Sequence, residues 1–355
     1  MTPCSLFSRT LAEFAIFVLA AGPAADAAIF QDHPPRQPSR RVVPDPPSSD
    51  VEFRQVGTLE GTTGPVYSLA WSPDGSTLAS AGYRNVLLWD PATGSIAGVL
   101  SGHENYIWGV AWSPDGETLA SASADGTVKL WRVSDLTEIG SAGNSWTMCV
   151  AWSPDGNLLA TGNIGGRVQI RDAATLDLVR EWSVGSWIIA TEWSADSGRL
   201  LVGDLAGRVS LYDTNSGELL RRFRTPLNSN DANGVTWSPD NATAVSAHQD
   251  GTTWFWDISS GDAIRTLAPH NGWARGVAFS PDGRMLVTTG EDATADVWAT
   301  DGWDSLARLR CPPQALWSVS WSPDGRFFAI GSGVYDSTVT SNIFIWEVSV
   351  GPSGD

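Results

Sequence analysis

The pentapeptide Trp112-Ser-Pro-Asp-Gly116 occurs four times in this chain, and three variants of it occur between the exact copies. The other exact copies are Trp71–Gly75, Trp152–Gly156 and Trp321–Gly325, and the variants begin at Trp193, Trp237 and Phe279. The leading aromatic residues are spaced 40 to 44 residues apart. Seven copies at so regular a spacing indicate seven structural repeats, which cover about residues 51–349.

Each repeat has the pattern of four short β-strands. An apolar segment such as residues 106–112 ends in the motif, and its β-branched and aromatic side chains favour a strand. In Ser-Pro-Asp-Gly, Pro presets φ for the first corner and Gly accepts positive φ, so the motif predicts a turn. Two more strands are expected over residues 118–123 and 127–131, with a tight turn at 124–126, and residues 96–100 illustrate the fourth. Four antiparallel strands in about 41 residues match one blade of a β-propeller.

The third strand of a repeat often ends in an aromatic residue followed by Asp, as in Trp89-Asp90 and Trp256-Asp257. In the other repeats this pair is Trp131-Arg132, Arg171-Asp172, Tyr212-Asp213, Trp298-Ala299 or Trp346-Glu347. Together with Gly102-His103 and residues 125–127, these pairs resemble the WD40-repeat family over nearly all of residues 51–349. The resemblance implies an all-β fold, a seven-bladed propeller of four-stranded antiparallel blades. A TolB-type propeller, which also uses a Ser-Pro-Asp-Gly turn, is the alternative.

The two ends of the repeat region complement each other. Residues 53–59 match a fourth strand without its preceding three, and residues 342–349 match a third strand without its fourth. The N-terminal strand is therefore expected to complete the last blade and close the ring, which removes open sheet edges. In that blade residues 333–341 lengthen the second turn, and insertions of this kind sometimes bind ligands.

The resemblance also implies a buried hydrogen-bonded tetrad of His, Ser or Thr, Asp and Trp in a blade. Counted from the motif, the tetrads are His103, Ser121, Asp125 and Trp131; Asn228, Ser246, Asp250 and Trp256, with Asn in place of His; and His270, Thr288, Asp292 and Trp298. Such groups are buried only when they are paired. The third and fourth repeats have Arg171 and Tyr212 at the Trp position, so we expect them to be less regular.

No catalytic motif is evident. A His, Asp and Ser/Thr set could imitate a hydrolase triad, but the resemblance implies that these groups are buried and structural. The motif Asp is interpreted as a turn residue and not as part of a calcium loop. Cys4, Cys149 and Cys311 are too dispersed to predict a disulfide or a Cys-based metal site. The sequence therefore predicts a protein that is not an enzyme and that uses no metal or cofactor.

The N-terminal part has a different composition. Residues 1–27 combine the mostly apolar segment Leu11–Ala21 with a small-residue cleavage pattern at Ala25-Asp-Ala27, which is typical of an export signal. Glu13 within the apolar segment is atypical, and without export the protein would be cytoplasmic. The segment is too short to span a membrane. Residues 28–50 are rich in Pro and are expected to form an extended linker, and residues 350–355 a flexible tail.

The overall charge restricts the partners. The chain has 39 acidic and 22 basic side chains and a formal charge of −17. Such a surface repels phosphate backbones and anionic lipids, so nucleic acid and membranes are not expected as partners.

Tryptophan is frequent, with 19 residues, and eight of these stand outside the motif and strand-end positions. Five of the eight lie four or six residues before a motif aromatic, and two Tyr share these offsets. In the WD40 family this is the start of the innermost strand, at the channel rim on the top face. The predicted face contains Tyr67, Tyr106, Trp108, Trp146, Trp187, Trp273 and Trp317, with Asp231, Gln249, Arg275 and Glu291 as polar members.

Aromatic and Arg side chains concentrate affinity at protein interfaces, and an exposed apolar patch on a soluble protein needs a cover. The predicted function is therefore a scaffold that binds a protein or peptide on this face, with Arg275 as a charged contact. The scaffold would act as a monomer or within a hetero-complex. Two alternatives remain: a carbohydrate or other small ligand stacked on the rings, or rings that fill the channel mouth and bind nothing.

Overall fold

The computed structural model describes residues 51–350 except 144, 224–230 and 335–339. Every regular element in this part of the chain is a β-strand, and no helix long and apolar enough to cross a membrane occurs there. The predicted export signal and linker lie outside the described residues, as does the tail apart from Val350, which ends the last strand.

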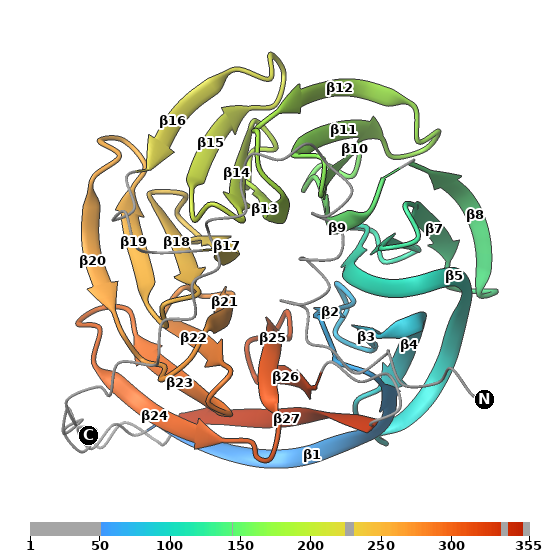
Figure 1. Ribbon diagram of the computed structural model, residues 1–355. Helices are drawn as coiled ribbons and strands as arrows, with labels where there is room; N and C mark the ends of the chain where they lie inside the picture. The colour runs from blue at the N-terminus through green and yellow to red at the C-terminus, as the bar shows by residue number, and fades with distance from the viewer. Residues whose placement is uncertain (1–50, 144, 224–230, 335–339, 351–355) are drawn as a thin grey trace, which may run out of the picture.

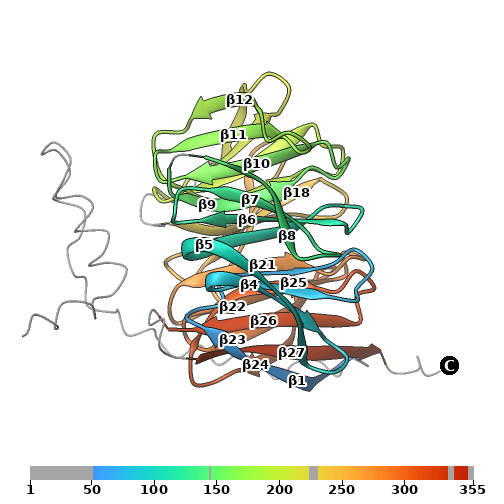
Figure 2. The same ribbon diagram turned by 90° about the vertical axis from the view of Figure 1, so that its right-hand side faces the viewer.

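The strands form antiparallel sheets that lie side by side around a common axis (Figure 1) and stack one beside the next when viewed edge-on (Figure 2). The first sheet contains β2 (Ser68–Trp71), β3 (Leu78–Ala81), β4 (Tyr83–Asp90), β5 (Ser95–Trp112), β6 (Thr118–Ser123), β7 (Val128–Arg132) and β8 (Thr137–Ala142). The first part of β5 pairs with β4 and its last part with β6, so this sheet is two four-stranded units that share one long strand.

The next three sheets have four strands each, in chain order. They are β9 (Thr147–Trp152), β10 (Leu158–Asn163), β11 (Arg167–Asp172) and β12 (Leu178–Ser183); β13 (Ile188–Trp193), β14 (Arg199–Asp204), β15 (Val209–Asp213) and β16 (Leu219–Phe223); and β17 (Ala232–Trp237), β18 (Thr243–His248), β19 (Thr253–Asp257) and β20 (Ala263–Leu267). A further such sheet contains β21 (Ala274–Phe279), β22 (Met285–Gly290), β23 (Thr294–Ala299) and β24 (Ser305–Arg310).

The last sheet joins the two ends of the repeat region. Its order is β1 (Val51–Thr63), β27 (Thr340–Val350), β26 (Phe327–Gly333) and β25 (Ala315–Trp321). Phe53 lies opposite Val348 and Leu59 opposite Ile343, so the pairing that the sequence predicts between the two end segments is present. In Figure 1 β1 runs along the outer edge beside β27.

The Ser and Asp of the motif form the turn between the first two strands of a repeat. In the second repeat the Ser113 hydroxyl donates to Asp115 Oδ1 over 2.6 Å and accepts the Thr118 backbone N–H over 3.0 Å. Gly116 has a φ of 74°, which a side chain would disfavour. The Ser–Asp bond recurs in all seven copies of the motif.

The motif Trp has a second role that is not predicted from the sequence. Its indole Nε1–H donates a hydrogen bond across the seam, the boundary between two neighbouring sheets. The acceptor is a backbone carbonyl of the preceding repeat, in the residue just before the motif aromatic of that repeat. Six bonds of 3.0 to 3.3 Å repeat this contact: Trp71 to Ser320, Trp112 to Ala70, Trp152 to Ala111, Trp193 to Ala151, Trp237 to Glu192 and Trp321 to Ala278. The side chain of Phe279, the seventh motif aromatic, has no N–H and cannot make this bond.

Apolar packing also lies largely between neighbouring sheets. Val287 and Val297 of one sheet share a core with Phe328 and Trp346 of the next. Phe328 is completely buried, and burial of such a side chain contributes about 1.5–3 kcal/mol. Each sheet is thus stabilised mainly by its two neighbours.

The third and fourth repeats form complete four-stranded sheets, so the irregularity expected of them is not observed. Arg171 replaces the missing Trp by donating to the Leu176 carbonyl and to Gln169 Oε1, both over 2.8 Å. Tyr212 packs against Trp182, with the ring centroids 5.2 Å apart. Other side chains therefore fill the place of the tetrad.

Candidate binding face

The innermost strands β2, β5, β9, β13, β17, β21 and β25 lie against one another in sequence around the axis, and β25 also lies against β2. In six of them the residue four before the motif aromatic falls within a register shift, so it is an extra residue of a β-bulge. These residues are Trp108, Met148, Ile189, Asn233, Arg275 and Trp317. A bulge takes its residue out of the regular alternation of side chains along the strand.

Aromatic rings from the first, second and seventh repeats meet one another. The Tyr67 ring lies 4.2 Å from Trp108, 5.9 Å from Tyr106 and 5.5 Å from Trp317, measured between centroids. Tyr83 extends the cluster because its centroid lies 4.9 Å from that of Tyr106. Tilted and edge-to-face pairs of this kind contribute about 0.5–1.5 kcal/mol each beyond area burial.

Arg275 joins Trp273 to this aromatic cluster. Its guanidinium carbon lies 4.1 Å from the ring centroids of both Trp273 and Trp317, so the group is sandwiched between two indoles. The guanidinium also forms an ion pair with Glu291 and donates to Asn233 Oδ1 over 3.4 Å. Only 11% of the side chain is exposed. The sequence predicts Arg275 as a charged contact for a partner; in the structure its guanidinium also acts as a clamp between two Trp rings.

Acidic groups flank the clamp. The pKa of Asp231 is raised to about 7, mainly by burial; the positive charge of Arg275 opposes this rise and the negative charge of Asp204 adds to it. Glu291, with 29% of its side chain exposed, balances the charge of Arg275. Gln249 is half-buried, and its backbone N–H donates to the Asp231 carbonyl over 3.1 Å. Asp231, Gln249, Arg275 and Glu291, the polar residues of the predicted face, thus belong to the fifth and sixth repeats.

Trp146 and Trp187 directly precede β9 and β13 and are half-buried. Their carbonyls accept the backbone N–H groups of Ile164 and Leu205, so the chain is fixed at the same point in both repeats. In the described ranges, Trp187 has no ring contact with the aromatic cluster. The structure thus unites Tyr67, Tyr106, Trp108, Trp273 and Trp317 and leaves Trp187 as a separate half-exposed ring.

Tyr83 belongs to the aromatic cluster but was not among the predicted residues. It lies twelve residues after the motif aromatic Trp71, the same offset that places Gln249 and Glu291. Counting forward as well as backward from every motif would have found it.

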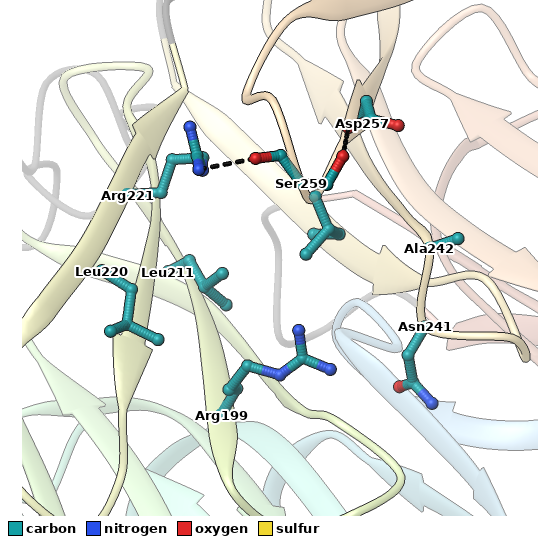
Figure 3. A pocket seen from close by; sticks show the side chains of 9 residues that line it. Arg199, Leu211, Leu220, Arg221, Asn241, Ala242, Asp257 and Ser259 are labelled. Carbon is teal, nitrogen blue, oxygen red and sulfur yellow. Dashed lines mark hydrogen bonds between the residues drawn. The ribbon is translucent and has the colours of Figure 1, made fainter.

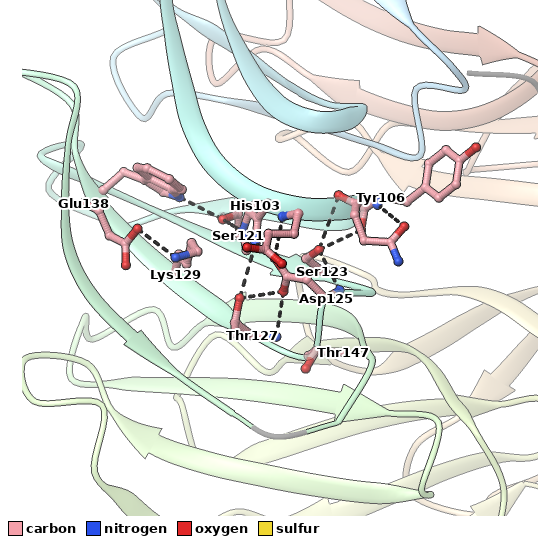
Figure 4. Close-up of polar contacts among 12 residues, drawn as sticks. His103, Tyr106, Ser121, Ser123, Asp125, Thr127, Lys129, Glu138 and Thr147 are labelled. Atoms are coloured by element: carbon pink, nitrogen blue, oxygen red, sulfur yellow. Dashed lines mark hydrogen bonds and ion pairs between the residues drawn. The ribbon is translucent and has the colours of Figure 1, made fainter. Parts of the chain in front are cut away.

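The tetrads of the second and sixth repeats are formed (Figure 4 shows the second). His103 Nδ1 lies 2.7 Å from Asp125, its Nε2 lies 2.7 Å from Ser121 Oγ, and Trp131 Nε1 donates to the same hydroxyl over 2.8 Å. Burial opposes the ionisation of Asp125, but hydrogen bonds, first that from the Thr127 hydroxyl, lower its pKa to about 2. Ser121 is completely buried.

In the sixth repeat the corresponding distances are longer. His270 lies 3.1 Å from both Asp292 and Thr288, and Trp298 Nε1 donates to Thr288 over 3.4 Å. The His270 ring fits because Gly290 has no side chain; a Cβ there would come within 2.5 Å of the ring.

The fifth repeat departs from the predicted tetrad. Trp256 Nε1 donates to Ser246 Oγ over 3.0 Å, as expected, but the imidazole beside Ser246 comes from His248, two residues along the same strand, at 2.8 Å. Asp250 is exposed and accepts from Thr252 instead, and Asn228 lies outside the described residues. His248 occupies the sequence position that is Gly290 in the sixth repeat, so the ring enters from the strand rather than from the preceding loop.

Within the described part of the chain, His, Cys, Asp and Glu side chains form no group of three or more that could hold a metal ion. Cys149 and Cys311 are buried thiols without a disulfide.

Comparison with protein families gives two matches. The family described as "WD domain, G-beta repeat" matches residues 53–90, 94–132, 217–257, 261–299 and 303–340. The family described as "Anaphase-promoting complex subunit 4 WD40 domain" matches residues 136–196. No curated protein shows significant similarity to the chain.

Proposed function

The chain belongs to the WD40-repeat family, and we propose that it is a non-enzymatic scaffold that binds a protein or peptide at the aromatic end of its inner strands. WD40 repeats generally mediate protein–protein interaction. Family membership supports the scaffold role, and the particular side chains of this chain support the choice of face.

The proposal includes a closed ring of seven blades. Seven motif copies, the pairing of β1 with β27, and the contact of β2 with β25 all favour it. The bond from Trp71 Nε1 to the Ser320 carbonyl repeats, between the first and last repeats, the seam found between consecutive ones. A closed ring would present all seven strand starts on one side.

The observation that carries the proposed function is the continuous contact from Tyr83 through Tyr106, Tyr67 and Trp317 to Arg275. Rings held in this way are ordered before a partner arrives, so little side-chain entropy is lost on binding. They are half-exposed rather than buried, with Trp317 as the exception at 9%. Preorganised aromatic side chains that still reach solvent are typical of interface hot spots.

Affinity capture followed by mass spectrometry tests this proposal. Trp108→Ala and Trp273→Ala, combined in one chain, should lose the partners that the unchanged protein retains. Trp182→Ala is the matched control, because Trp182 is also a half-buried Trp but lies on the outer strand β12. All proteins are first compared by thermal unfolding.

Equal capture by the double variant and the unchanged protein would refute the proposed face. A fluorescence titration with a panel of glycans distinguishes the carbohydrate alternative: saturable quenching that the double variant abolishes would assign a sugar in place of a protein.

A further inference from the structure

A hollow of about 550 Å³ opens between the fourth and fifth repeats (Figure 3). Arg199, at the start of β14, lies opposite the end of β15, whereas Asp204 at the other end of β14 lies opposite Ile188 at the start of an inner strand. The hollow is therefore at the motif-turn end of the sheets, away from the candidate binding face. A ligand here would be independent of the proposed function.

Two Arg side chains line the hollow, although the chain as a whole carries a charge of −17. Arg221 donates to the Ser260 carbonyl over 2.6 Å and to the Ser259 carbonyl over 2.7 Å. These bonds cross from one repeat to the next and hold the guanidinium in place (Figure 3). Neutral carbonyls fix the group, and Arg221 forms no ion pair within the part of the chain that the structure describes.

Arg199 is also positioned without a close counter-ion. Its guanidinium carbon lies 5.1 Å from the ring centroid of Trp237. The carboxylate that pairs with it, on Asp196, is 3.9 Å away and largely exposed. Asp196 pairs with Arg199 through Oδ2, while its Oδ1 accepts the Ser194 hydroxyl and the Gly198 backbone N–H; a long and exposed ion pair of this kind is weak.

One carboxylate lines the hollow, that of Asp257. Its Oδ1 accepts the Ser259 hydroxyl and the Ser260 backbone N–H, and these bonds lower its pKa, the Ser259 bond most. The carboxylate therefore stays ionised and is directed to its own turn. Of the residues that line the hollow, Arg199 and Arg221 are basic and Asp257 is acidic, so the lining itself carries a net positive charge that favours an anionic ligand.

The hollow also has apolar lining residues, which favour a ligand with an apolar group. Leu211 and Ile258 are buried beneath the hollow, while Leu220 is 46% exposed at its edge. Leu219, next to it on β16, is 40% exposed, and β16 is the outermost strand of its sheet. A ligand that satisfies the site carries a negative group and an aliphatic group a few ångströms apart.

We propose that this hollow docks an acidic peptide segment of a partner protein, with a carboxylate side chain paired to Arg199 and Arg221 and a neighbouring aliphatic side chain packed on Leu220. A polyanion fits less well, because the net charge of the chain repels extended phosphate backbones and anionic membranes. A short segment with one or two carboxylates brings the complementary charge and meets less of that repulsion.

The test is selection of random heptapeptides displayed on phage against the full chain. Selected sequences should combine Asp or Glu with Leu, Ile or Val. The best of them, made as a fluorescent peptide with an amidated C-terminus, should bind Arg199→Gln and Arg221→Gln at least roughly tenfold more weakly in an anisotropy titration. Replacement of its acidic residues by Asn or Gln should cause a similar loss.

Arg180→Gln is the matched control. Arg180 occupies the position of Arg221 one repeat earlier and donates in the same way across a seam, to the Ser216 carbonyl over 3.3 Å. Its removal takes away one positive charge and one seam contact but leaves the hollow intact, so binding should not change. Arg199→Gln leaves both seam bonds of Arg221 in place and is decisive if Arg221→Gln unfolds.

Three results would overturn the inference: no peptide selected, selected peptides without acidic residues, or undiminished binding by Arg199→Gln. The Trp108→Ala, Trp273→Ala double variant separates the two proposals. It should keep the acidic peptide, whereas loss of the peptide in that variant alone would place the peptide on the aromatic face.

Discussion

Replacement of Ser121 by Ala should destabilise the protein far more than loss of one hydroxyl suggests. His103 Nδ1 faces Asp125, a carboxylate that can only accept, so the ring proton resides on Nδ1 and Nε2 accepts. Burial lowers the pKa of His103 and keeps the ring neutral. Ser121 consequently donates to His103 and accepts from Trp131, and Ala would leave one acceptor and one donor unpaired.

Each buried group left unpaired costs about 1–3 kcal/mol, so Ser121→Ala should lower the free energy of unfolding by about 2–6 kcal/mol. Thr288→Val, at the same place in the sixth repeat, should cost less because its hydrogen bonds are 3.1 and 3.4 Å long. Urea unfolding followed by fluorescence measures both, with the exposed Ser141→Ala as control. A loss below about 0.5 kcal/mol in Ser121→Ala, equal to that of the control, would refute this reading of the tetrad.

Three further predictions concern particular contacts. Burial lowers the pKa of His248 to about 4, below the ordinary 6.5, so protonation favours the unfolded chain; its contribution is complete above pH 6.5 and is lost as the pH falls towards 4. His248→Gln should therefore reduce the fall in urea stability between pH 7 and 4.5, and an unchanged fall would contradict this. Trp112→Phe removes the 3.0 Å bond to the Ala70 carbonyl and should cost about 1 kcal/mol or more in the same assay; no loss would show that the seam bond is not stabilising. A Cβ on Gly98 would lie 2.8 Å from Leu136, which has a φ of 58°, so Gly98→Ala should destabilise the protein, and Leu136→Gly should relieve it; additive effects in the double-mutant cycle would disprove direct contact.

The backbone could be predicted from the sequence because one contact recurs. Wherever Ser113 and its counterparts appear, the hydroxyl caps the turn and sets where the first strand ends and the second begins. The strands then follow at fixed offsets, and the two unmatched end segments, 53–59 and 342–349, must find each other. Because this turn is local and recurs in every repeat, the strand positions can be predicted by counting residues from each motif.

The side-chain contacts between neighbouring sheets could not be predicted by counting residues from the motif. The Trp112 indole bonds to a carbonyl of the preceding repeat, and Arg221 bonds to carbonyls of the following one. Both contacts depend on how two sheets stack, which no single repeat encodes. His248 is the clearest case, since an imidazole reaches the same hydroxyl position from a different place in the chain.

The difference between contacts within a repeat and contacts between sheets also explains which positions of this chain can vary. On the aromatic side, the bulge residues Trp108, Asn233 and Arg275 stand where the register shifts and no ladder position constrains the side chain. Aromatic and charged residues can collect there without disturbing the sheets.

At the motif-turn end of the sheets, the size of a residue in one repeat depends on the size of its contact residue in the neighbouring repeat. Gly98 lies against Leu136, a bulky residue in a loop of the following repeat, whereas the long side chain of Arg221 lies over Gly261, which has a φ of 81°. At these two seams a small residue meets a large one, and the choice of which repeat supplies the large one changes the surface. Where the large partner is Arg221, and Arg199 stands nearby, the seam becomes a cationic hollow. Under the two proposals, the regular backbone offers two independent sets of positions for recognition, one at each end of the strands.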